Sequence, residues 1–225
     1  MEYSGQDHLR RQAGLSYPNI KDKELTKRKL INAVGEIIRT EGYTGLGVNK
    51  IARQAQVDKK LIYRYFITVD RLIEEYVLEK DYWMLASEKM SDQALNDDLS
   101  ETITNILENQ FDFFYSQAEM QQLIIWEISG SKLMKSISVA REHLGEKFME
   151  LTDEYFEGSN INFRAIGALL SAGIYYMTLH APVTPYCGID LNIPAHRDEV
   201  RKTIRQIIRY AFDEAKAKRK DINGN

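Results

Sequence analysis

The chain has 225 residues and a formal net charge of −3, with 44% hydrophobic and 28% charged residues. These proportions suit a globular protein of one or two domains that buries a real core. A single cysteine, Cys187, excludes an internal disulfide framework and fits a reducing cytosol. The amino-terminal residues lack the apolar core of a signal peptide, so we expect a cytoplasmic protein. Four prolines and little alternation of apolar and polar residues predict an all-α fold.

Charge is distributed unevenly along the chain. Residues 1–72 contain 14 Lys and Arg against 8 Asp and Glu, whereas residues 73–225 contain 16 against 25. A positive field confined to one part of a protein attracts polyanions such as DNA. Chance clustering is the alternative that charge alone leaves open.

An arm and a helix are predicted at the amino terminus. Residues 1–20 contain Gly5, Gly14 and Pro18 and are predicted to form a flexible arm. A helix is predicted from about Lys23 to Glu41, because apolar residues recur there at helical spacing. Gly42 follows this pattern at the position where a helix commonly ends.

Two short helices with a tight turn between them are predicted from Val48 to Phe66. Apolar residues at helical spacing give the first of them one buried face. Asp58 can cap the second, because its carboxylate accepts from the free N–H groups there. Gln56 and Val57 leave almost no room for a loop. The pattern therefore predicts a helix-turn-helix, whose second helix can enter a DNA major groove.

The second of these helices carries basic and aromatic side chains. Ile62 and Phe66 are four residues apart and are expected to face the core. The side chains left outward are those of Lys59, Lys60, Tyr63 and Arg64. Lys and Arg neutralise phosphates and donate to guanine edges, and tyrosine hydroxyls donate to phosphates. The alternative is a solvated basic face on a plain three-helix bundle, which the helix-turn-helix pattern disfavours.

The rest of the chain also reads as helical. A long fourth helix is predicted from Thr68 or Asp70 to Trp83, linking the basic domain rigidly to the remainder. Further helices are predicted at 99–116, 120–128, 133–156, 162–180 and 195–218, with Glu142 and Glu146 on a solvated face of the third. The uncharged run at 165–181 is at the bottom of the range that spans a bilayer, and two prolines follow it closely. We therefore expect a buried helix there and no membrane partner.

The last two long helices predict a homodimer. Each is apolar over more surface than one small domain can obviously cover, so two from each subunit would form a four-helix interface. The side chains predicted at this interface are Ile174, Ile204, Ile208 and Phe212. The alternative is that both are core helices of a monomer, since a helix that is apolar all round can be internal.

Between Glu41 and Leu72, the order and spacing of residues resemble the DNA-binding signature of the tetracycline-repressor (TetR-type) family of transcriptional regulators. The matching positions are Glu41–Gly42–Tyr43, Val48, Ile51–Ala52, Ala55, Val57, Ile62–Tyr63, Tyr65–Phe66 and Leu72. The match covers about residues 24–73, and the remainder agrees only in being helical and of suitable length. The resemblance implies a three-helix DNA-binding domain at 21–72 and a larger helical ligand-binding and dimerisation domain at 73–218. The residues of the tail at 219–225 predict disorder.

By this resemblance, Tyr63 and Tyr65 would contact phosphates of double-stranded DNA. Lys59, Lys60 and Arg64 would lie at or near the base edges. Lys50 in the preceding helix is expected to contact the DNA backbone.

Three positions depart from the family pattern. Leu46 and Gly47 replace the usual Thr or Ser, although the Gly47 region can still offer backbone N–H groups. Leu61 replaces a small or hydroxylated residue and would touch a thymine methyl. Ile67 replaces the usual lysine, which removes one expected phosphate contact.

Members of this family bind DNA as homodimers and sense a small molecule with the carboxy-terminal domain. The aromatic residues of the acidic half predict a small apolar or aromatic effector. The residues predicted to bind it, from helices that would surround a cavity in this family, are Phe114, Trp126, Tyr176 and His180. Release of DNA on binding the effector is the expected response, giving a ligand-responsive repressor with a palindromic operator.

Catalysis has little support in the sequence. The four histidines show no spacing typical of a metal site, Cys187 has no nearby basic partner, and no phosphate-binding glycine loop occurs. We therefore expect no enzyme activity, metal or cofactor. The remaining alternative to a DNA-binding regulator is a helical adaptor that binds protein partners.

Overall fold

The computed structural model describes residues 20–82 and 98–223, and the named elements within these ranges are helices. The predicted all-α fold with an amino-terminal helix-turn-helix is confirmed. Trp83 and nearly all of the predicted arm lie outside the described residues. Within the described ranges, no helix combines the length and the apolar character needed to cross a bilayer.

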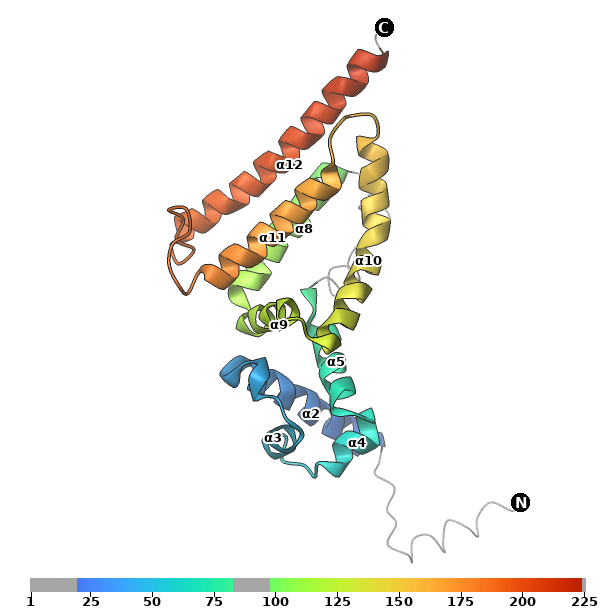
Figure 1. Ribbon diagram of the computed structural model, residues 1–225, viewed down its shortest axis with the longest axis vertical. Coiled ribbons are helices and arrows are strands. Elements are labelled where there is room, and N and C mark those ends of the chain that lie inside the picture. The colour runs from blue at the N-terminus through green and yellow to red at the C-terminus, as the bar shows by residue number, and fades with distance from the viewer. Residues whose placement is uncertain (1–19, 83–97, 224–225) are drawn as a thin grey trace, which may run out of the picture.

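The molecule is elongated, with the basic helices at one end (Figure 1). There, α2 (Ile20–Glu41), the short 3-10 turn η1 (Tyr43–Gly45), α3 (Val48–Gln54) and α4 (Lys60–Phe66) form a compact unit. The helix α5 (Val69–Lys80) leads from this unit toward the rest of the chain. It ends before the predicted Trp83, because Asp81 adopts an extended backbone conformation.

The larger part of the molecule contains five helices in the described ranges. They are α8 (Leu99–Ser116), α9 (Ala118–Ile128), α10 (Lys132–Phe156), α11 (Phe163–His180) and α12 (Pro194–Asn223). The helices α8, α11 and α12 lie side by side, α10 packs against α11 on the side away from α12, and α9 lies next to the basic end (Figure 1). The tail predicted to be disordered from 219 instead continues α12 as far as Asn223, because Arg219 and Lys220 have high helix propensity and follow an Ala- and Lys-rich helical segment.

Two buried clusters hold the helices together. The first packs α2–α5 against α9 and the start of α10, and includes Leu30, Ile62, Tyr76 and Leu123. The second joins α8, α11 and α12. The first cluster continues past residue 72, so the basic unit is packed firmly onto its neighbours. The division of the chain at 72/73 stays a prediction.

The end of α4 contains a strained residue. Ile67 has φ of 71° and ψ of −46°. The N–H of Thr68 donates to the carbonyl of Phe66 at 2.8 Å. The backbone at Ile67 therefore forms the γ-turn with positive φ, which is rare and strained. β-Branched residues rarely adopt positive φ. Because Ile67 is 78% exposed, its side chain contributes little burial.

We expect Ile67→Gly to raise the free energy of unfolding by about 1 kcal/mol, since relief of strain exceeds the entropy cost of glycine. Urea titration of both proteins measures this difference. A less stable variant would show that the turn carries no strain.

Candidate nucleic-acid interface and ligand cavity

The helix-turn-helix holds α4 firmly against the core. Ile51, Ile62 and Phe66 are buried, as predicted. The N–H of Val57 donates to the carbonyl of Ala52 at 3.0 Å, which closes the turn between the two helices. The Asp58 carboxylate accepts from the N–H of Lys60 at 2.8 Å, so the predicted capping of the second helix is confirmed.

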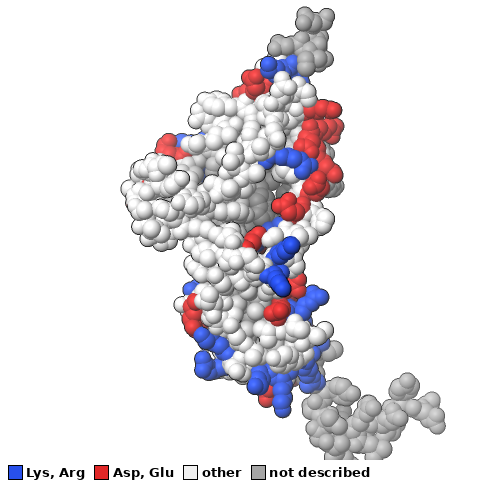
Figure 2. Space-filling view, in the orientation of Figure 1, with Lys and Arg blue, Asp and Glu red and all other residues white. Residues whose placement is uncertain are grey.

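The outer face of α4 is basic and unpaired. Lys59, Lys60, Tyr63 and Arg64 are exposed. Within the part of the chain that the structure describes, the ammonium and guanidinium groups of these residues form no ion pair. Basic side chains gather at this end of the molecule (Figure 2). A polyanion can therefore approach these groups without displacing an acidic partner.

The other predicted DNA contacts are less accessible. Tyr65 and Leu61 are half-buried, and the Tyr65 ring packs against the first core cluster. Gly47 precedes α3, and a Cβ atom added there would meet no other atom within 4 Å. Lys50 Nζ lies 2.5 Å from Glu41 Oε2, so a phosphate contact would compete with this ion pair. All these assignments stay predictions.

The helix α9 connects the basic unit to the rest of the molecule. The Trp126 ring stacks on Tyr43 of η1, with 5.4 Å between centroids and 8° between planes. The Tyr76 hydroxyl donates to Glu119 at 2.7 Å. Burial and the Glu119 carboxylate raise the pKa of Tyr76 well above its usual value. Tyr76 therefore stays protonated and keeps donating this hydrogen bond.

A buried arginine ties the end of α5 to α9 and α10. Arg141 Nε donates to Asp81 Oδ2 at 2.7 Å, and Arg141 also pairs with Glu127. Only 11% of the Arg141 side chain and 1% of the Asp81 side chain are exposed. Burial alone would lower the pKa of Arg141, but the two carboxylates raise it above its ordinary value. The guanidinium is therefore permanently charged.

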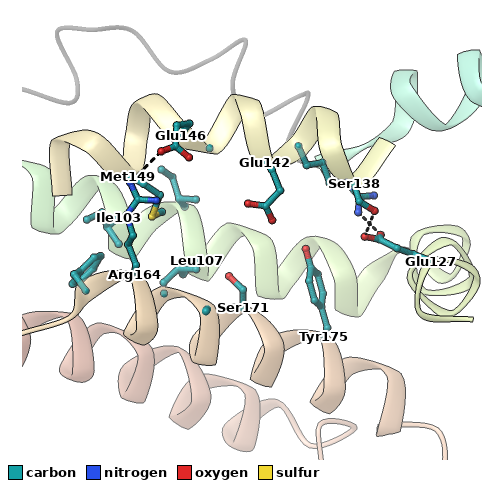
Figure 3. Close-up of a pocket in the computed structure, with 16 residues that line it drawn as sticks. Ile103, Leu107, Glu127, Ser138, Glu142, Glu146, Met149, Arg164, Ser171 and Tyr175 are labelled. Carbon is teal, nitrogen blue, oxygen red and sulfur yellow. Dashed lines mark hydrogen bonds and ion pairs between the residues drawn. The ribbon is translucent and has the colours of Figure 1, made fainter. Parts of the chain in front are cut away.

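A cavity of about 410 Å³ lies between α8, α10 and α11, a size typical of ligand sites (Figure 3). We call it the α10–α11 cavity. Its apolar wall is formed by Ile103, Ile106, Leu107, Met149, Phe163 and Ala168. Its polar groups belong to Glu127, Ser138, Arg141, Glu142, Glu146, Arg164, Ser171 and Tyr175. Glu142 and Glu146 are exposed as predicted, but they also border a cavity, which their sequence pattern does not indicate.

None of the four predicted effector residues lines this cavity. Phe114 is buried among aromatic rings, and Trp126 is covered by Tyr43. Tyr176 is 50% exposed and stacks on His180, on a different face of α11 from the cavity residue Tyr175. One residue along a helix rotates a side chain by about 100°, so a one-residue difference decides which tyrosine meets the cavity.

The four residues predicted at the dimer interface lie in the interior of the chain instead. Ile174, Ile204, Ile208 and Phe212 are all buried within the second core cluster of their own chain. The reason is that α8 covers the apolar stripe of α12 and one side of α11. These side chains are therefore unavailable to another subunit, and their assignment to a dimer interface is corrected.

The comparisons with known proteins agree with this architecture. Residues 30–76 match the family model described as bacterial regulatory proteins, tetR family. The HTH-type transcriptional repressor SCO4008 of Streptomyces coelicolor is 26% identical over 201 residues, which cover 84% of this chain and 97% of the relative.

Two solved structures show the same fold. A TetR family transcription regulator from Marinobacter aquaeolei has a TM-score of 0.62 at 14% identity, covering 83% of this chain and 96% of its own. GusR of Salmonella enterica has a TM-score of 0.57 at 12% identity, covering 82% and 95%. The fold and the basic helix-turn-helix define a DNA-binding regulator. In its amino-terminal domain and its fold, the chain is similar to transcriptional regulators of the TetR type.

Proposed function

We propose that this regulator is a cytoplasmic, ligand-responsive repressor that binds a palindromic operator as a homodimer. The observation that carries the proposal is the exposed and unpaired basic face of α4, which a helix-turn-helix presents to the major groove. The similar Streptomyces protein is named as a repressor, which supports the direction of regulation.

Selection from a pool of random DNA duplexes tests this proposal. The purified full-length protein should enrich one sequence motif that forms an inverted repeat, because a two-fold symmetric dimer presents two identical helices. Enrichment of no motif would contradict sequence-specific regulation and would favour an adaptor that binds protein.

A second subunit is proposed to pack on the outer face of α11 and α12. Leu169 and Tyr176 on α11 are 74% and 50% exposed, and Tyr210 on α12 is 57% exposed. Exposed Ala165 and Ala172 continue the apolar surface of α11. We call this surface the outer α11–α12 face. It has the apolar character of an interface and leaves the internal core intact.

The α10–α11 cavity is the proposed effector site. Its apolar wall suits a small molecule with an aromatic or aliphatic body. Glu127 lines the cavity, while the adjacent Trp126 stacks on η1 of the basic unit. A ligand that shifts α9 would therefore also shift the basic unit. We propose that effector binding releases DNA by this route.

DNA binding is expected to depend steeply on salt concentration. Each phosphate that a basic residue neutralises adds about 0.9 to the slope of log affinity against log salt. With Lys59, Lys60 and Arg64 free in each of two subunits, we expect a slope steeper than about −3 for the selected duplex. Fluorescence anisotropy titrations from low to moderate salt measure it, and a flat dependence would contradict the assigned surface.

Two substitutions, one at the N-cap of α4 and one on its outer face, should have different effects. Lys59→Ala is expected to change the ranking of operator variants, because a lost base contact costs about 1–3 kcal/mol at one position. Tyr63→Phe should weaken binding to all variants alike, through one lost phosphate hydrogen bond. Affinities for a set of single-base operator variants test both. An unchanged ranking for Lys59→Ala would exclude Lys59 as a base-reading residue.

A further inference from the structure

The two arginines in the wall of the α10–α11 cavity are each outnumbered by carboxylates. Arg141 pairs with Asp81 and Glu127. Arg164 Nη2 lies 2.7 Å from Asp153 Oδ2 and 3.3 Å from Glu146 Oε1. Each arginine therefore contacts two carboxylates. Neither arginine is free to bind an anionic ligand.

Glu142 adds a fifth carboxylate, between these two groups. It lies one helical turn from Ser138 and one from Glu146, on the side of α10 that borders the cavity. Its carboxylate points into the space between α10 and α11 (Figure 3). Within the described residues it forms no hydrogen bond or ion pair. The only unpaired charge in the described wall of the cavity is therefore negative.

The remaining lining of the cavity favours an organic ligand over a metal ion. Ile103, Leu107 and Phe163 present hydrocarbon surface on the side formed by α8 and the start of α11. A hard metal ion needs several oxygen ligands around one point, and the described residues contain no cluster of three candidate metal ligands. Tyr175 extends into the cavity from α11, and an aromatic face attracts organic cations.

We propose that the effector of this regulator is an amphipathic organic cation, with its charge at Glu142 and its apolar body against Ile103, Leu107 and Phe163. This assignment rests on the proposed role of the cavity as effector site. Because Glu142 is exposed, the charged end lies at the open side of the cavity and the apolar end lies inside. A neutral ligand would leave the Glu142 charge without a partner, and an anionic one would be repelled.

Two probes that differ mainly in charge test this assignment. Methyltriphenylphosphonium carries a positive charge, and triphenylphosphine oxide has the same three phenyl rings but is neutral. Isothermal titration of the full-length protein should show the cation binding about tenfold tighter than the oxide. Equal affinities, tighter binding of the oxide, or binding of neither probe would overturn the proposal.

A matched pair of variants locates the charge. Glu142→Gln keeps the shape of the side chain but removes its charge, and should weaken binding of the phosphonium about tenfold while leaving the oxide unchanged. Glu150→Gln is the control, because Glu150 is an exposed residue of α10 that lies outside the cavity. It should leave both affinities unchanged. Circular dichroism verifies that both variants fold. If the two substitutions changed the affinity for the phosphonium equally, a role for Glu142 would be contradicted.

The affinity for the selected DNA duplex is measured on the same preparations. A protein that binds its duplex but does not prefer the phosphonium would overturn the cation assignment and leave the regulator function intact. A protein that selects no duplex would refute the regulator function whatever the probes show.

Discussion

Leu169→Glu is expected to convert the proposed dimer into folded monomers. Leu169 is 74% exposed in a single chain, so the substitution costs the isolated subunit little. In the dimer, the outer α11–α12 face would bury this charge without a partner in both subunits, at a cost of several kcal/mol. Linked recognition helices gain about 10²–10⁴ in avidity, so operator affinity should fall by at least about hundredfold. Sedimentation velocity and anisotropy titrations measure the two effects.

Ile128→Glu is the matched control for this experiment. Ile128 is also 74% exposed, but it lies at the end of α9, away from the proposed interface. This variant should remain a dimer with unchanged operator affinity. Ile208→Glu should instead unfold the chain, because Ile208 is fully buried in its own core. Wild-type protein that sediments as a monomer at micromolar concentration would refute the dimer.

Arg141→Met is expected to lower the free energy of unfolding by about 3–5 kcal/mol, because it breaks the buried ion pair between Arg141 and Asp81. Urea titration measures the loss. The double variant Arg141→Met with Asp81→Asn should recover part of it, since removing both charges costs less than removing one.

Arg164→Met provides the comparison. Arg164 also pairs with two carboxylates in the same cavity wall, but 41% of its side chain is exposed. Solvent screens such pairs, so the loss should be much smaller. Equal losses for the two variants would show that burial does not determine how much the Arg141 ion pairs contribute to the free energy of unfolding.

The DNA-binding end could be predicted from the sequence because its determinants are local. Ile62 and Phe66 determine which side of a two-turn helix is buried. The short turn at Gln56 and Val57 determines that the preceding helix lies directly beside it. Once the buried side is known, the outward positions of Lys59 and Tyr63 follow from helical geometry alone.

The cavity and the interface depend on contacts between distant segments, which local patterns do not specify. The apolar stripe of α12 predicts an interface, because nothing near it in the sequence shows that α8 covers Ile204 and Ile208. The helix α11 is apolar on all sides, so its pattern does not indicate which of its side chains face a cavity. The sequence therefore does not distinguish Tyr176 from Tyr175, and it is Tyr175 that lines the cavity. The sequence pattern around Glu142 is that of a glutamate on a solvated helix face. An exposed charge is tolerated both there and in the open wall of a cavity, so the pattern does not distinguish the two positions.

Hydroxyl-radical footprinting of the wild-type protein on the selected duplex tests the central claim most directly. If two α4 helices related by a two-fold axis enter successive major grooves, the backbone should be protected in two segments centred about 10 base pairs apart on an inverted repeat. The Leu169→Glu variant should protect neither segment at the same concentration. A single protected segment with wild-type protein, or uniform protection along the duplex, would contradict the account.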